Sequence, residues 1–181
     1  MSQLVIDCLT DAFFASLAGA GFAMLSNPPL RTIFISALLA AIAHSFRYLL
    51  MQWGIEIAFA TLIVSFLVGA LSIPFAHWVH SPPDVFAFPS LLPMIPGMLI
   101  YKTILGLIKY INVEELAGAE TILLTTVQSG LKATFILLSL SIGVSLPMLL
   151  LGKSSVKSTR LPKIFKREIF NFLPEERQKR R

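Results

Sequence analysis

Two groups of residues inside hydrophobic stretches could do chemistry. His44 and Arg47 are three residues apart, so they share one face of a helix. Histidine exchanges protons near neutral pH, and an ionisable group in a membrane segment is a functional candidate by default. Asp11 could pair with Arg47 or Lys132 if their helices touch. We therefore expect proton coupling or an ion pair from Asp11, His44 and Arg47. Each residue also has a structural alternative. His44 could be packed and hydrogen-bonded, Arg47 could extend to water, and Asp11 could be an interfacial acid that is favoured near the start of a helix.

The second group is a proline-rich stretch that ends in a tyrosine and a lysine, made of Pro93, Pro96, Gly97, Tyr101 and Lys102. The prolines have no amide hydrogen and would leave carbonyl groups unpaired, which membrane proteins tolerate only beside protein or a water-filled cavity. A half-helix that starts near Pro96 would favour a carboxylate at its amides, and Gly97 would allow close approach. Lys102 lies near the middle of this segment, where snorkelling is costly. We predict a substrate-binding site here; a proline kink with a paired lysine is the alternative.

Gln128 and Lys132 are secondary candidates on the last hydrophobic segment. A helix of that length, about 46 Å at 1.5 Å per residue, exceeds the bilayer core. Lys132 then falls at the outer boundary, where it can snorkel to water. Together with Gln128 it could alternatively extend a polar vestibule.

The elements that must position these residues are hydrophobic helices. Only 14% of the 181 residues are charged, mean hydropathy is +0.76, and residues 57–83 and 133–152 carry no charge. This composition predicts an all-α, polytopic membrane protein rather than a soluble domain. We expect about five transmembrane helices within a domain at 1–152, the fourth of them broken at Pro93–Gly97. Their expected ranges are 4–25, 30–51, 55–79, 85–111 and 121–151.

Charge is concentrated in the tail at 153–181, which holds ten Lys or Arg and three Glu. The bias of positive charge towards the inside predicts a cytoplasmic tail and, with five crossings, an N-terminus outside. We expect a multi-pass protein of the cytoplasmic (inner) membrane whose tail contacts anionic lipid. Nucleic-acid binding is not expected.

Sequence signatures of enzymes are missing, including Walker, GxSxG, HExxH and dinucleotide motifs. Cys8 is the only cysteine, so no intrachain disulfide and no Cys/His metal spacing arises. We therefore expect no catalytic activity, no metal and no cofactor.

Five motifs occur in one order along residues 4–151. They are Gly21-Phe-Ala-Met24 with Asn27, Pro28 and Arg31; His44-x-x-Arg47; Leu67-Val-Gly69; Pro93-Met-x-Pro96-Gly97-x-x-x-Tyr101; and Leu140-Ser-Ile-Gly143 with Ser145 and Pro147. Together they resemble the threonine/serine exporter family, specifically its C-terminal membrane half, which also occurs as a separate YjjB-like small subunit.

The resemblance implies a secondary active exporter of threonine and serine, or of a dicarboxylate such as succinate. It implies that the chain works with a larger membrane subunit that carries the other half. Our hypothesis is an antiporter driven by the proton-motive force, with a higher oligomer as one arrangement. The match covers His44, Arg47, Pro93, Pro96, Gly97 and Tyr101, whereas Lys102, Lys132 and Asp7 rest on the physical argument alone. A non-transporting membrane scaffold or assembly subunit is the alternative.

Overall fold

The computed structural model describes residues 2–112 and 118–151, in which every regular element is a helix. Four helices are long and apolar enough to cross a membrane, and a bent pair makes a fifth if it forms one span. The predicted all-α polytopic fold is thereby confirmed. The basic tail at 153–181 lies outside the described residues. The elements are α1 (Ser2–Met24), α2 (Leu30–Gln52), α3 (Ile57–Val79), α4 (Asp84–Leu91), the 3-10 helix η1 (Leu92–Met94), α5 (Gly97–Ile111) and α6 (Ala119–Leu151).

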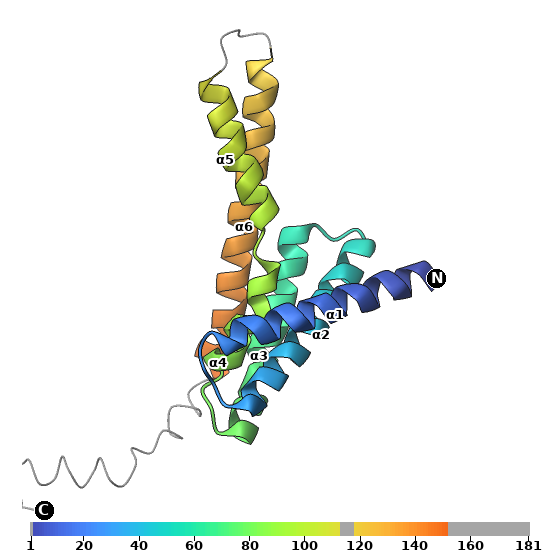
Figure 1. Cartoon of the computed structure of the whole chain (residues 1–181), viewed down its shortest axis with the longest axis vertical. Coiled ribbons are helices and arrows are strands. Elements are labelled where there is room, and N and C mark those ends of the chain that lie inside the picture. Colours follow the sequence, from blue (N-terminus) through green and yellow to red (C-terminus); the bar gives the residue numbers. More distant parts are fainter. Residues whose placement is uncertain (1, 113–117, 152–181) are drawn as a thin grey trace, which may run out of the picture.

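The helices α1, α2, α3 and α4 form the lower bundle in Figure 1, with α1 lying across it. α1 packs mainly on α2 and also reaches α4 and η1. Small residues let the α1 and α2 backbones approach, since a Cβ added to Gly19 would lie only 2.6 Å from the Cβ of Ala40. This close crossing brings the polar residues of α1 and α2 together.

The fourth hydrophobic segment is broken where its prolines predict. α4 with η1 and then α5 meet at an angle of 52°. Ile95, which precedes Pro96, has an extended ψ of 129°, in line with the restricted backbone before proline. The predicted break at Pro93–Gly97 is therefore confirmed, and α5 begins at Gly97.

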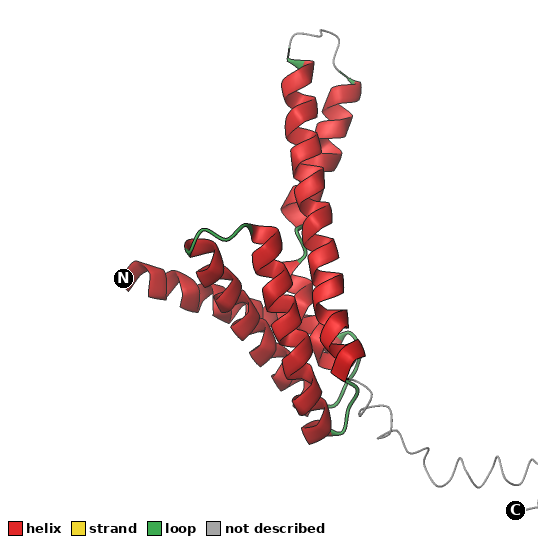
Figure 2. Ribbon diagram, turned by 180° about the vertical axis from the view of Figure 1, so that it is seen from behind, coloured by secondary structure: helices red, strands yellow, loops and turns green. Residues whose placement is uncertain are grey.

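α6 has two different partners along its 33 residues. Its C-terminal half packs on α3, where a Cβ added to Gly143 would lie 2.9 Å from the Leu62 carbonyl oxygen. The Ser65 hydroxyl also donates across this interface to the Ser139 carbonyl at 2.9 Å. The N-terminal half packs on α5, and Figure 2 shows this pair projecting beyond the bundle.

The buried core lies where α2, α3, α4 and η1 meet the C-terminal half of α6. Its largest fully buried side chains include Leu39, Phe86, Met94 and Ile136. Outside this core the helices expose many large apolar side chains, as expected of surfaces that face lipid. The core thus holds the end of η1, the last residue before the break, in a fixed position.

Candidate functional site

Asp11 of α1 and His44 of α2 meet across the contact between these helices and form an ion pair when the imidazole is protonated. The Asp11 Oδ2 and His44 Nδ1 atoms are 3.4 Å apart, and the side chains are 42% and 8% exposed, respectively. The aspartate is thus open on one side while the imidazole is enclosed. Among the described residues this is the one carboxylate–cation contact within 4 Å.

The imidazole of His44 is held without a well-formed hydrogen bond. Its contact with Asp11 does not reach hydrogen-bond geometry, so neither ring nitrogen has a hydrogen-bond partner among the described residues. A buried polar group without a partner costs about 1–3 kcal/mol. Native structures keep few such groups, and each calls for an explanation, such as a functional role.

Arg47 connects the same face of α2 to the broken span. Its half-buried guanidinium donates from Nη1 to the Met94 carbonyl at 3.5 Å, a distance at the long end of the range. Met94 ends η1, so this oxygen stands directly before the break. In a continuous helix the Met98 amide would donate to the Met94 carbonyl. Here the extended Ile95 interrupts the series of helical hydrogen bonds, and the Met94 carbonyl accepts from Arg47 instead.

The charged residues and the break are therefore one connected group, which we term the Asp11–Met94 cluster: Asp11, His44, Arg47 and Met94. Asp11 pairs with His44, and not within 4 Å with either Arg47 or Lys132 as we considered from the sequence. The cluster joins α1, α2 and η1.

The first amides of α5 are mostly occupied. The Gly97 amide donates to the Ile95 carbonyl at 2.8 Å, and the Leu99 amide donates to the Pro96 carbonyl at 3.1 Å. Among the amides of Gly97, Met98 and Leu99, only that of Met98 has no backbone acceptor within the described residues. Gly97 itself is open, since an added Cβ would meet nothing within 4 Å. The break thus offers a single free amide beside an accessible backbone.

Tyr101 and Lys102 lie on the open side of α5, which buries none of its residues. Tyr101 is 59% exposed, Lys102 is exposed, and neither side chain hydrogen bonds to any described residue. Both lie within two turns of the break. The structure thus presents them outward and does not pair Lys102 with a neighbouring helix of the described chain.

Gln128 and Lys132 lie exposed on α6. No hydrogen bond or ion pair within the described ranges joins either side chain to the Asp11–Met94 cluster. They belong to the stretch of α6 that packs on α5, where Gly106 accommodates Thr126 and Gly130 accommodates Thr103.

A small cavity of about 140 Å³ lies beside the break, between α4, η1 and α6. Leu92 and Ile95 line it from the break, and Ser141 is its only side chain with a polar group. This cavity is too apolar to bind a charged metabolite by itself. A polar ligand at the break would have to use the open side near Gly97 and Met98.

Met94 is the member of the cluster that reasoning from the sequence missed. Counting four residues back from each proline points to the carbonyls of Pro89 and Leu92, yet the Leu92 carbonyl accepts from the Ile95 amide at 3.1 Å. The usable signal was Ile95. Proline disfavours the helical region for the residue before it. Ile95 has left that region, so the Met94 carbonyl just before it loses its helical partner, whereas Leu92 before Pro93 stays helical.

The geometry defines a multi-pass helical membrane protein in which a broken segment lies close to a half-open Asp11–His44 pair. The family model described as "Threonine/Serine exporter, ThrE" matches residues 11–150. The chain therefore belongs to the threonine/serine exporter family, as its motifs indicated, and has an exporter-type transport role. No solved structure matches the chain.

Proposed function

We propose that this chain is one subunit of a two-component antiporter that exports small carboxylate-bearing metabolites, threonine and serine or a dicarboxylate such as succinate. In this proposal it lies in the cytoplasmic (inner) membrane with its tail inside. The proton-motive force drives export, and a larger membrane subunit supplies the other half. The observation that carries the proposal is the Asp11–Met94 cluster, because it links a group able to carry a proton to the break.

Proton coupling would begin at Asp11 and His44. A protonated imidazole attracts the carboxylate, whereas a neutral imidazole beside a protonated Asp11 does not. Asp11 is the exposed partner, so protons would enter and leave through it. Since the pair bridges α1 and α2, gain or loss of a proton would change how firmly α1 sits on α2.

Arg47 would pass that change on to the break. It sits one turn from His44 on the same face, and its guanidinium reaches the Met94 carbonyl. A protonated His44 repels the neighbouring guanidinium, whereas a neutral His44 does not. The protonation state of the Asp11–His44 pair would therefore strengthen or weaken the contact between Arg47 and the Met94 carbonyl at the end of η1.

The substrate carboxylate would bind on the open side of the break. The free Met98 amide offers one donor, Gly97 lets the ligand reach the backbone, and Lys102 and Tyr101 lie one to two turns further along α5. One amide and an exposed lysine make an incomplete site. A larger subunit that covers this face of α5 would add the missing walls and exclude water.

Efflux of radiolabelled threonine, serine and succinate tests the proposal, using vesicles with the chain alone, with the larger subunit alone and with both. We expect export of at least one of these substrates only when both are present, and collapse of export when a protonophore removes the proton gradient. Export by the larger subunit alone at the full rate would contradict it. That result would favour a non-transporting scaffold.

A further inference from the structure

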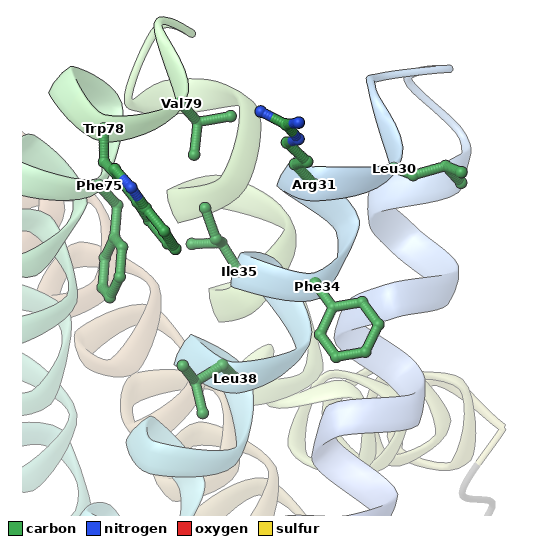
Figure 3. A pocket seen from close by; sticks show the side chains of 8 residues that line it. All are labelled: Leu30, Arg31, Phe34, Ile35, Leu38, Phe75, Trp78 and Val79. Atoms are coloured by element: carbon green, nitrogen blue, oxygen red, sulfur yellow. The ribbon is translucent and has the colours of Figure 1, made fainter.

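A groove separate from the Asp11–Met94 cluster opens between the start of α2 and the end of α3. It has a volume of about 570 Å³ and is lined by Leu30, Arg31, Phe34, Ile35, Leu38, Phe75, Trp78 and Val79. Figure 3 shows Trp78 and Phe75 facing Ile35 and Leu38 across it, with the Arg31 guanidinium at the end near Val79. Seven of the eight side chains are apolar or aromatic, and Arg31 supplies the only full charge.

The groove lies at one end of two membrane-spanning helices, since Arg31 is in the first turn of α2 and Trp78 in the last turn of α3. Arginine and tryptophan are residues typical of a membrane interface, where tryptophan sits at headgroup level. The apolar lining runs inwards from there through Ile35 to Leu38. Depth and polarity therefore change along the groove as they do along a phospholipid.

The charge of Arg31 is not stabilised by any group of the described residues. A cation in the first turn opposes the helix dipole, which favours negative charge there. The guanidinium has no hydrogen bond and no carboxylate within 4 Å among the described residues; the ion pair found there joins Asp11 to His44. Arginine's planar fork of donors matches phosphate geometry.

We propose that this groove binds an anionic phospholipid, with the headgroup phosphate on Arg31, Trp78 beside the headgroup and one acyl chain along Ile35, Leu38 and Phe75. Basic pockets between transmembrane helices recognise anionic headgroups in this way. The assignment is independent of the proposed transport function. It would place a structural lipid at the α2–α3 end of the bundle, the end at which α6 also finishes (Figure 1).

The two tryptophans of the chain provide the test. Trp53 directly follows α2 at its other end, and both indoles are 75% exposed, so Trp53 is a matched control for Trp78. W53F leaves Trp78 as the only tryptophan, and W78F leaves Trp53. The purified full-length variants are reconstituted in phosphatidylcholine with about 10 mol% of a brominated lipid, which quenches nearby indole fluorescence.

With brominated phosphatidylglycerol we expect Trp78 to be quenched at least about twofold more than with brominated phosphatidylcholine, while Trp53 shows no such preference. R31Q in the W53F background should remove the preference, because it removes the cation that holds the phosphate. Soluble glycerol 3-phosphate in excess should not relieve the quenching, because it lacks the acyl chains.

Equal quenching of Trp78 by both lipids, or an unchanged preference in R31Q, would overturn the proposal. Relief by glycerol 3-phosphate would assign the site to a soluble phosphate instead. Weak quenching of Trp78 by both lipids would mean that another protein surface covers the groove, which also contradicts it.

Discussion

The Asp11–Met94 cluster and the α5–α6 pair carry charge in opposite ways. In the cluster, Asp11 and His44 pair across two helices and Arg47 binds a backbone oxygen. On the pair formed by α5 and the N-terminal half of α6, Lys102 and Lys132 are exposed, and no described residue binds either ammonium group. One region holds its ionisable groups against other groups of the chain, and the other presents its charges outward. Under the proposed function, the first region would act inside this subunit and the second would meet a partner.

Of the changes that test this comparison, closing the break should have the largest effect on export. Replacing Pro96 and Gly97 together by alanine would let the helix continue, so that the Met98 amide takes the Met94 carbonyl from Arg47. We expect export to fall to background, at least about a hundredfold, while membrane insertion persists, as measured by radiolabelled efflux and by protein level in the membrane.

Pro74→Ala is the matched control, because Pro74 lies inside α3 and away from the break. It should leave export nearly unchanged. Normal export by the double variant would remove the break from the mechanism.

Gly106 tests what holds α5 to α6. If close backbone packing rather than charge joins them, Gly106→Leu should destabilise the protein by about 1–3 kcal/mol, as overpacking does, because a Cβ there would overlap Thr126. Reversible unfolding in mixed micelles measures the change. Gly21→Leu is the control, since an added Cβ at Gly21 meets nothing within 4 Å. Equal stability of the two variants would show that the pair is not held in this way.

A substitution at Arg47 tests whether its contact with Met94, rather than its positive charge alone, supports export. Arg47→Gln is too short to reach the Met94 carbonyl, so the end of η1 loses its tie to α2. We expect export to fall about tenfold, which corresponds to about 1.4 kcal/mol, with Lys109→Gln on exposed α5 as the control. Efflux rates at saturating substrate provide the measurement. A fall of similar size in both variants would indicate a general loss of positive charge rather than a lost contact.

The smallest effects should lie on the α5–α6 pair. Lys102→Gln should leave the stability of the isolated chain unchanged, within about 0.5 kcal/mol as for other surface substitutions, and yet weaken export about threefold when the larger subunit is present. Lys132→Gln should change export by less than about twofold, since an exposed lysine can extend its side chain along the helix to reach water. Destabilisation of the isolated chain by Lys102→Gln would mean that this lysine is already paired within the chain.

The break and the long helices were predictable because they depend on local chemistry. Pro93 and Pro96 forbid a regular ladder wherever they fall, and an uncharged run of twenty residues signals a membrane span regardless of its neighbours. The position of His44 and Arg47 on one face of α2 likewise follows from helix geometry. These features need no knowledge of how helices pack.

The partner of Asp11 and the freed carbonyl of Met94 depend on packing between helices that are far apart in sequence. Asp11 meets His44 across the α1–α2 contact, in which Gly19 and Ala40 let the two helices approach closely. The outward orientation of Lys102 was also beyond a count of depth, which gives a position along the segment but not a direction around it. Contacts between helices decide both.

The central claim is that the Asp11–His44 pair couples proton movement to transport. The most direct test compares substrate exchange with substrate accumulation that is driven by a proton gradient. In proteoliposomes that hold both subunits, His44→Gln should retain exchange of labelled for unlabelled substrate, because exchange needs no net proton transfer. The same variant should lose at least about tenfold of substrate accumulation driven by an acidic lumen, together with the accompanying rise in lumenal pH. His77→Gln, an exposed histidine at the end of α3, should lose neither. Gradient-driven accumulation at the wild-type rate in His44→Gln would contradict the account.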